Sequence, residues 1–191
     1  MVVQGTRGRA STRFDAPESR HAWVTGARGE ERFAKVLEGI DGLRILHDRR
    51  VPRSRANIDH IVIAPAGVFV VETRAYRGTI ETRNRGRLLR PDYRLYVGRR
   101  DCSALAAGLG WQVEVVTTAL TANGVDPLPA VIPVLFFVDG EWPLFLAPNV
   151  YAGVRLEGTR SIRRLVAKPD VLDPASIDRL TRLLSVALPA N

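Results

Sequence analysis

The chain has 191 residues and a formal net charge of +8, and 46% of its residues are hydrophobic. This length and apolar content predict a globular domain with a full hydrophobic core and exclude a disordered chain. No run approaches the roughly 18 apolar residues of a membrane-spanning helix, and the N-terminal residues lack the apolar segment of a signal peptide. We therefore expect a cytoplasmic protein with no membrane partner. The single Cys102 excludes an internal disulfide and a cysteine-built zinc site.

Basic residues are in excess, which makes a polyanion, and nucleic acid first, the expected partner. Of the 28 basic residues only Lys35 and Lys168 are lysines, so genome base composition is an alternative explanation for the arginine content. Residues 1–20 are polar and include four arginines, which predicts a flexible basic tail. Residues 21–191 are expected to form one domain.

The segment from Thr25 to Ile40 has the periodicity of a helix, with Phe33 and Leu37 on its apolar stripe. Glu30 lies in line with that stripe, so its carboxylate is expected to point towards a sheet. A glutamate near a helix N-terminus also suits the helix dipole, and this second explanation stays open.

Residues 43–51 are predicted to form a strand, on which His47 and Asp48 are expected to be a polar pair at the edge of the sheet. The basic loop after it, PRSRA, carries Arg53 and Arg55 and is a candidate for phosphate contact.

Two β-branched runs, Ile58–Ile63 and Val68–Val71, are joined by the turn residues Ala-Pro-Ala-Gly and predict an antiparallel hairpin. If Ile63 pairs with Val68, then Asp59 faces Glu72 on one side of the sheet. Directly opposed like charges are destabilising, so the pair needs a compensating cation. A bound divalent cation is one candidate, and Arg74, two residues after Glu72 on the same face, is the other.

The next segment is rich in arginine and is predicted to contain a hairpin, Thr79–Arg83 with Arg87–Leu89, around Asn84-Arg85-Gly86. A further strand is expected from Arg94 to Asp101. Arginines can bind phosphate and the interleaved tyrosines can stack on bases, so we predict a nucleic-acid surface here; a solvated sheet face is the alternative. The arginines are Arg83, Arg85, Arg87, Arg90, Arg94, Arg99 and Arg100.

The remaining elements follow from periodicity and capping residues. The predicted helix over Ser103–Asn123 contains a polar residue, Gln112. The predicted elements are a helix over Ser103–Asn123, strands at Val131–Val138, Leu144–Leu146 and Val150–Leu156, a helix over Ser161–Ala167, and a last helix capped by Asp173.

Three of these stretches together resemble a known family. GARGEERFAKVLEGI, LHDRRVP and NIDHIVIAPAGVFVVETRAYRG, within roughly residues 24–120, resemble the nuclease-related domain (NERD) family of the PD-(D/E)xK superfamily. The resemblance implies a restriction-endonuclease-like α/β fold, with a mixed central sheet flanked by helices.

The resemblance also implies roles for single residues. Asp59 and Glu72 would be the metal-binding acids, Glu30 the acid on the first helix, and Gln112 the helix glutamine. Arg74 occupies the lysine position, which is a departure from the family pattern because arginine cannot act as a base. Relatives often carry a tyrosine four residues after the glutamine, where this chain has Val116.

The implied function is phosphodiester hydrolysis, specifically a Mg²⁺-dependent DNA endonuclease with Mg²⁺ or Mn²⁺ held by Asp59 and Glu72. Arg53, Arg55, Arg83, Arg85, Arg87 and Arg94 would hold the nucleic-acid backbone. The alternative is a catalytically inactive module that binds nucleic acid or a protein partner, with Arg74 replacing the metal as the counter-ion. Related nucleases often need a dimer to cut both strands, so a homodimer is a further expectation.

Overall fold

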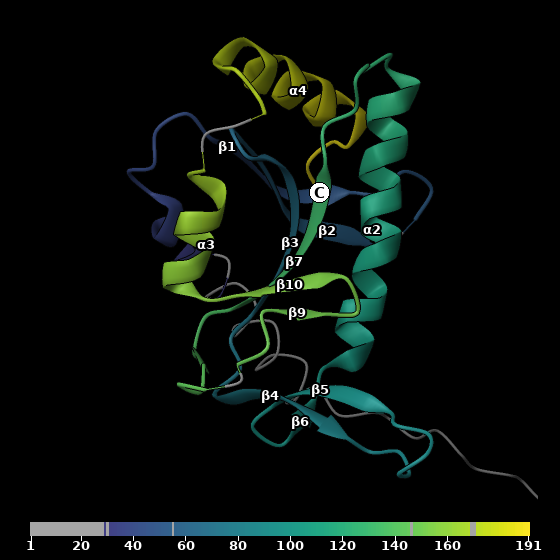
Figure 1. Cartoon of the computed structure of the whole chain (residues 1–191). Helices are drawn as coiled ribbons and strands as arrows, with labels where there is room; N and C mark the ends of the chain where they lie inside the picture. Colours follow the sequence, from purple (N-terminus) through teal and green to yellow (C-terminus); the bar gives the residue numbers. More distant parts are fainter. Residues whose placement is uncertain (1–28, 30, 55, 146, 169–170) are drawn as a thin grey trace, which may run out of the picture.

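A mixed six-stranded sheet forms the centre of the computed structural model, which describes residues 29, 31–54, 56–145, 147–168 and 171–191 (Figure 1). The strand order is β1-β2-β3-β7-β10-β9. β1, β2 and β3 are antiparallel neighbours, whereas β3, β7 and β10 run parallel to one another. The strands are β1 (Arg44–Arg50), β2 (Asn57–Ala64), β3 (Gly67–Arg74), β7 (Val131–Phe137), β10 (Val154–Glu157) and β9 (Val150–Tyr151).

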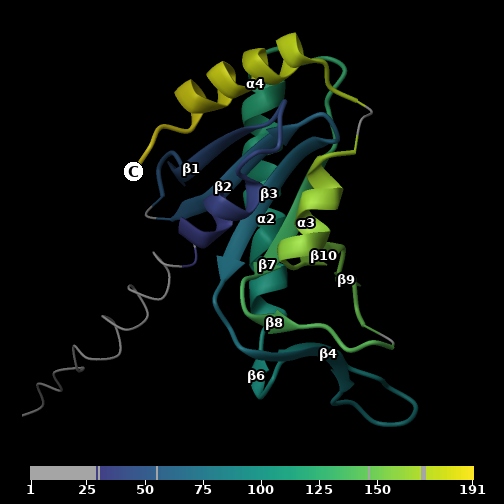
Figure 2. The ribbon, with the colours of Figure 1, turned by 90° about the vertical axis from the view of Figure 1, so that its left-hand side faces the viewer.

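Helices cover both faces of this sheet (Figure 2). On one face lie α2 (Ser103–Ala122) and α4 (Pro174–Ala187), which share an apolar core with the sheet. On the other face lie the helix over residues 31–37 and α3 (Thr159–Val166), which form a second core. The predicted fold class, a mixed central sheet flanked by helices, is therefore confirmed.

β3 is buried from both sides because its side chains alternate between the two cores. Val68 and Val70 belong to the core under α2 and α4, while Phe69 and Val71 belong to the core on the opposite face; all four are fully buried. A strand covered on both faces reads as a continuous apolar run, which is why its sequence carries no alternation of apolar and polar residues.

A second, four-stranded sheet follows β3 after a three-residue link, residues 75–77, and lies beyond the end of the central sheet (Figure 1). Its strand order is β6-β5-β4-β8. Its strands are β4 (Gly78–Asn84), β5 (Tyr93–Val97), β6 (Arg100–Asp101) and β8 (Gly140–Glu141).

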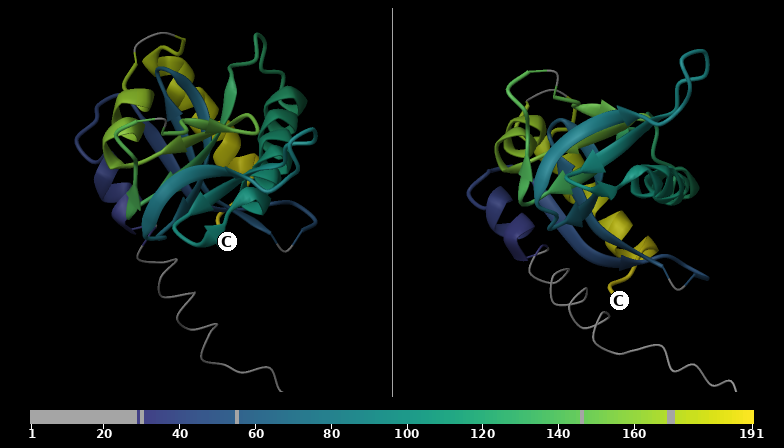
Figure 3. Two further views of the ribbon diagram at one scale, coloured as in Figure 1. Left: turned by 60° about the horizontal axis from the view of Figure 1, so that its bottom comes forward. Right: turned by 90° about the horizontal axis from the view of Figure 1, so that it is seen from below.

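The predicted hairpin around Asn84-Arg85-Gly86 is wrong. β4 pairs with β5, placing Ile80 opposite Val97 and Thr82 opposite Leu95. Leu95 and Val97 alternate into the core with Ile80, whereas the sequence Arg-Leu-Leu-Arg after Gly86 offers no such alternation. Residues 85–92 therefore form a projecting loop between the two strands, which we call the arm (Figure 3).

Several other predictions have clear outcomes. Asp173 caps α4, since its carboxylate accepts a hydrogen bond from the Ser176 amide at 2.7 Å. Leu144 and Phe145 form a bend, so the predicted strand there is wrong, and Leu146 lies outside the described residues. The predicted tail over residues 1–20 and the first turn of the first helix also lie outside them. Among the helices of the described part, none has the length and apolar character needed to cross a membrane.

Candidate functional site

The β2–β3 hairpin has the predicted register, and its open end carries the two carboxylates. Ile61 faces Val70 and Ile63 faces Val68, and the paired residues end with His60 opposite Val71. Asp59 and Glu72 are the next residues along each strand, on the face covered by α2. Their side chains are 18% and 11% exposed.

Arg74 lies between the two carboxylates. Its Nη1 donates to Asp59 Oδ2 at 3.2 Å, and its Nη2 donates to Glu72 Oε1. The Thr73 amide donates to the same Asp59 oxygen at 3.1 Å, and Arg74 also bonds the Thr73 carbonyl at 2.7 Å. The cation that the opposed carboxylates require is thus present in the chain itself.

Gln112 reaches this cluster from the middle of α2. Its Nε2 donates to Glu72 Oε2 at 2.9 Å, while its Oε1 is buried and has no hydrogen-bond partner in the described part of the chain. The predicted convergence of Asp59, Glu72, Arg74 and Gln112 is therefore what the structure contains. The tyrosine position of the family pattern, Val116, is fully buried one turn further along and packs in the core.

Burial dominates the electrostatics of the two acids. It raises the pKa of both Asp59 and Glu72 above the ordinary carboxyl value, although the charge of Arg74 acts in the opposite direction. The charge of Asp59 also raises the pKa of Glu72, and the charge of Asp48 raises that of Asp59. Both acids therefore hold a proton more tightly than solvated carboxyl groups do.

Two predicted site residues, Glu30 and Arg55, lie outside the described residues. Arg53 is exposed in the loop between β1 and β2, in a left-handed conformation with φ of 61°. Gly29, the first described residue, is helical and lies against Thr73, since a Cβ built on it would come within 3.3 Å of the Thr73 methyl group. The chain at Gly29 therefore lies beside the end of β3 that carries the carboxylates.

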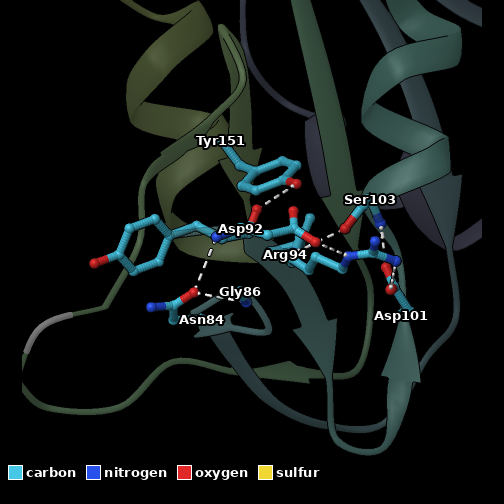
Figure 4. A network of polar contacts seen from close by, with 9 residues as sticks. Asn84, Gly86, Asp92, Arg94, Asp101, Ser103 and Tyr151 are labelled. Carbon is cyan, nitrogen blue, oxygen red and sulfur yellow. Dashed lines mark hydrogen bonds and ion pairs between the residues drawn. The ribbon is translucent and has the colours of Figure 1, made fainter. Parts of the chain in front are cut away.

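The predicted arginine surface divides into two groups. Arg83 pairs with Glu81 and stacks over Tyr96, and Arg94 pairs with Asp92 at 2.8 Å and Asp101 at 3.5 Å (Figure 4). These two arginines make their contacts within the small sheet and the base of the arm. Arg85, Arg87 and Arg90 are exposed on the arm, and within the described residues none of them forms an ion pair.

The structure also contains a basic cleft that was not predicted from the sequence. It has a volume of about 580 Å³ and is lined by Tyr76, Arg77, Arg99 and Arg100, with Ala75 and Val97. Arg100 lies 4.4 Å above the ring of Tyr76. Ala75–Arg77 directly follow Arg74, so the cleft adjoins the acids along the chain. Arg99 and Arg100 were part of the nucleic-acid surface predicted from the sequence. Their position near Arg77 could not be predicted, because it depends on the pairing of β4 with β5.

A comparison with protein-family models matches residues 25–137 to the nuclease-related domain. This match spans more than half of the 191 residues and includes the hairpin, Arg74 and Gln112. The chain belongs to the nuclease-related domain family. Searches among curated proteins and among solved structures found no match.

The predicted polar pair of His47 and Asp48 is wrong, because His47 contacts the buried His60 instead. His47 and Asp48 do not act together: the Nδ1 atoms of His47 and His60 lie 2.9 Å apart, and Asp48 accepts a hydrogen bond from Asn57. His60 is fully buried and stacks on Phe33 at 4.4 Å. Burial lowers the pKa of His60 to about 3, so this ring is neutral at physiological pH.

A second cleft, of about 590 Å³, is formed mainly by residues beyond the end of the nuclease-related domain match. Trp142, Arg155 and Glu157 line it. Glu157 is buried and pairs with Arg155 at 2.8 Å on the sheet face opposite the carboxylates. The cleft is therefore separate from the site of Asp59 and Glu72.

Proposed function

We propose that this protein hydrolyses phosphodiester bonds in DNA, with a divalent cation held by Asp59 and Glu72. One observation carries the proposal: two largely buried carboxylates from neighbouring strands converge on a single positive charge, and Gln112 fixes one of them from α2. Like charges at this position lower stability. A chain that keeps them there is expected to use them, and membership of a nuclease-related family is consistent with that use.

The donor set suits Mg²⁺ or Mn²⁺. Mg²⁺ is typically held by one or two carboxylates together with phosphate oxygens and water. Within the described residues no group of three or more His, Cys, Asp or Glu side chains is placed to hold a metal, so substrate and solvent would supply the other ligands. Arg74 would have to turn away from the acids, and its side chain is already 28% exposed.

A cation held there would neutralise charge on the scissile phosphate and make water a better nucleophile. The residues of the chain would do the rest. Gln112 orients the Glu72 carboxylate, and the Thr73 amide orients that of Asp59. Arg74 cannot accept a proton, but its planar guanidinium can hold two phosphate oxygens at once.

The nucleic-acid backbone would lie over the basic cleft beside the acids. Arg77, Arg99 and Arg100 line this cleft, and arginine binds phosphate in a bidentate manner. A single site cuts one strand, so cleavage of both strands of a duplex would require a homodimer or two successive binding events. Sedimentation of the protein with and without duplex DNA tests the homodimer.

The test is a cleavage assay on supercoiled plasmid with Mg²⁺ or Mn²⁺. We expect nicking by the wild type and none by Asp59→Asn. Glu81→Gln, which removes an exposed carboxylate on β4, is the matched control and should cleave normally. Equal cleavage by the wild type and Asp59→Asn would indicate a contaminating nuclease, and no cleavage by any of the proteins would overturn the hydrolase proposal.

A second candidate function is a nucleic-acid-binding module without catalysis. It is favoured by the bonds from Arg74 to both acids, since a permanent internal counter-ion makes a metal unnecessary. In that case the wild type would bind DNA with strong salt dependence, cleave nothing and show no heat on titration with Mn²⁺.

A further inference from the structure

The arm, residues 85–92, is a rigid element rather than a loose connection. At its base, the Asn84 side chain accepts hydrogen bonds from the Gly86 and Asp92 amides, both at 2.9 Å (Figure 4). Further out, Arg87 and Arg90 exchange two backbone hydrogen bonds, of 3.0 and 2.9 Å. The arm is thus a closed hairpin, with two residues at its tip.

Gly86 allows the two sides of the arm to meet. A Cβ at this position would lie 2.1 Å from the Arg90 carbonyl oxygen, a distance that no side chain can occupy. The base of the arm is held from outside as well. Arg94 joins Asp92 to Asp101 on β6, and the Tyr151 hydroxyl on β9 donates to the Tyr93 carbonyl at 3.0 Å.

The two tip residues are leucines that nothing in the described chain covers. Leu88 is 95% exposed and Leu89 is 90% exposed, and the whole segment from Asn84 to Arg94 is exposed. In the ribbon the arm projects away from the rest of the small sheet (Figure 3). A single exposed leucine is ordinary. Two adjacent leucines held at the end of a rigid projection form an apolar contact surface.

The sides of the arm are strongly basic. Arg85, Arg87 and Arg90 flank the leucines, and the one acid in the arm, Asp92, is paired with Arg94 at its base. The arm therefore presents an apolar tip between positive charges that form no ion pair within the described part of the chain. Proteins that kink duplex DNA use this combination: arginines contact the phosphates, and an apolar wedge enters between two base steps of the minor groove.

We propose that the arm inserts Leu88 and Leu89 between stacked base pairs of duplex DNA, while Arg85, Arg87 and Arg90 hold the flanking phosphates. The inference rests on the proposed function insofar as the partner is DNA, but it does not require cleavage. The basic cleft of Arg77, Arg99 and Arg100 and the arm lie at opposite ends of the paired strands β4 and β5, and in this proposal one duplex extends along the pairing to both. Insertion of the leucines would unstack neighbouring base pairs and kink the duplex that is bound to the small sheet.

The test uses the full chain in EDTA, so that binding is measured without cleavage. Short duplexes carry one 2-aminopurine at successive positions, because the fluorescence of this base rises when it is unstacked. The variant is Leu88→Ser/Leu89→Ser, which leaves the charge of the arm unchanged. The matched control is Leu144→Ser/Phe145→Ser, which removes an equally exposed apolar pair from another loop.

We expect the wild type and the control to raise the fluorescence at one or two adjacent positions, and the arm variant to lose this signal. Its affinity should fall roughly 5- to 20-fold, because lost apolar burial is partly offset by the unstacking that is no longer needed. Arg87→Gln/Arg90→Gln should instead lower the slope of log K against log salt by about 2, since each phosphate contact contributes about 0.9.

Three results would overturn the proposal and are distinguishable from one another. Duplex binding with no rise in fluorescence at any position would remove the wedge and leave the proposed function intact. Absence of DNA binding at low salt would remove both. Leucine-dependent sedimentation with vesicles of phosphatidylserine and phosphatidylcholine, without unstacking of DNA, would assign the tip to a lipid surface instead.

Discussion

Replacing Arg74 with glutamine should destabilise the protein through the two acids that share its charge. Removing one partner of a fully buried ion pair costs about 3–5 kcal/mol, whereas exposed pairs contribute about 0.2–1 kcal/mol. Arg74, Asp59 and Glu72 have side chains that are 28%, 18% and 11% exposed, which places them between these limits. We expect the free energy of unfolding near neutral pH to fall by about 2–3 kcal/mol, or roughly 5–10 °C in Tm.

The size of this loss should depend on pH. Burial raises the pKa of Asp59 and Glu72, and Arg74 opposes the rise, so its removal raises both values further. A carboxyl group with a raised pKa contributes stability below its ordinary pKa, and this contribution is lost as the pH rises through the raised value. The deficit of Arg74→Gln is therefore largest near pH 7 and should shrink towards about pH 4.

Urea denaturation in the presence of EDTA measures both effects. The matched control is Arg94→Gln, because Arg94 also contacts two carboxylates, Asp92 and Asp101, but at the exposed surface. We expect a much smaller loss for this control. Equal losses in the two variants, or a deficit in Arg74→Gln that does not shrink on acidification, would refute the view that Arg74 compensates two buried acids.

Three further predictions follow from single contacts. Gln112→Leu removes the 2.9 Å hydrogen bond to Glu72 together with a buried oxygen that has no partner among the described residues, so urea denaturation should show a loss of only about 1 kcal/mol, while plasmid nicking falls with Glu72 misaligned. Burial lowers the pKa of His60 from 6.5 to about 3, so the contribution of this residue to stability is fully present above pH 6.5 and is lost as the pH falls towards 3. This loss should reach about 2 kcal/mol near pH 5, and His60→Leu should abolish it in thermal melts over that range. Arg155→Gln leaves the buried Glu157 without its partner, and calorimetric Tm should fall by an amount that corresponds to about 2–4 kcal/mol, whereas DNA cleavage by the folded protein should be unchanged because the pair lies on the other face.

The hairpin and its cluster could be predicted from the sequence because local rules determine them. The short turn fixes the pairing of Ile63 with Val68, and alternation then brings Asp59, Glu72 and Arg74 to one face. Gln112 was predictable only through the family resemblance, since nothing in the spacing of α2 shows which strand it meets.

The small sheet could not be predicted correctly, because its pairing depends on the core. Asn84-Arg85-Gly86 has the composition of a turn, and a short hairpin there satisfies local preferences. The chain pairs β4 with β5 instead, since Leu95 and Val97 bury their side chains together with Ile80. The arm and the arginine cleft both result from this longer pairing, so neither could be predicted from the sequence.

The buried histidine contact was missed for a similar reason. His47 and His60 are 13 residues apart, and they meet because β1 and β2 pair with these two residues in register. His60 stacks on Phe33 from the first helix, a contact between elements that no sequence spacing indicates. The adjacent Asp48 suggested a local partner for His47, but in the structure this acid accepts from Asn57.

The central claim is that Asp59 and Glu72 hold a divalent cation for hydrolysis of DNA, and calorimetric titration with Mn²⁺ tests it most directly. The account predicts one site in the wild type and in the Glu81→Gln control, no site in Asp59→Asn, and tighter binding in Arg74→Ala, where the competing guanidinium is gone. A silent titration of the wild type, with a site present only in Arg74→Ala, would contradict the account and make Arg74 the permanent counter-ion of a non-catalytic domain.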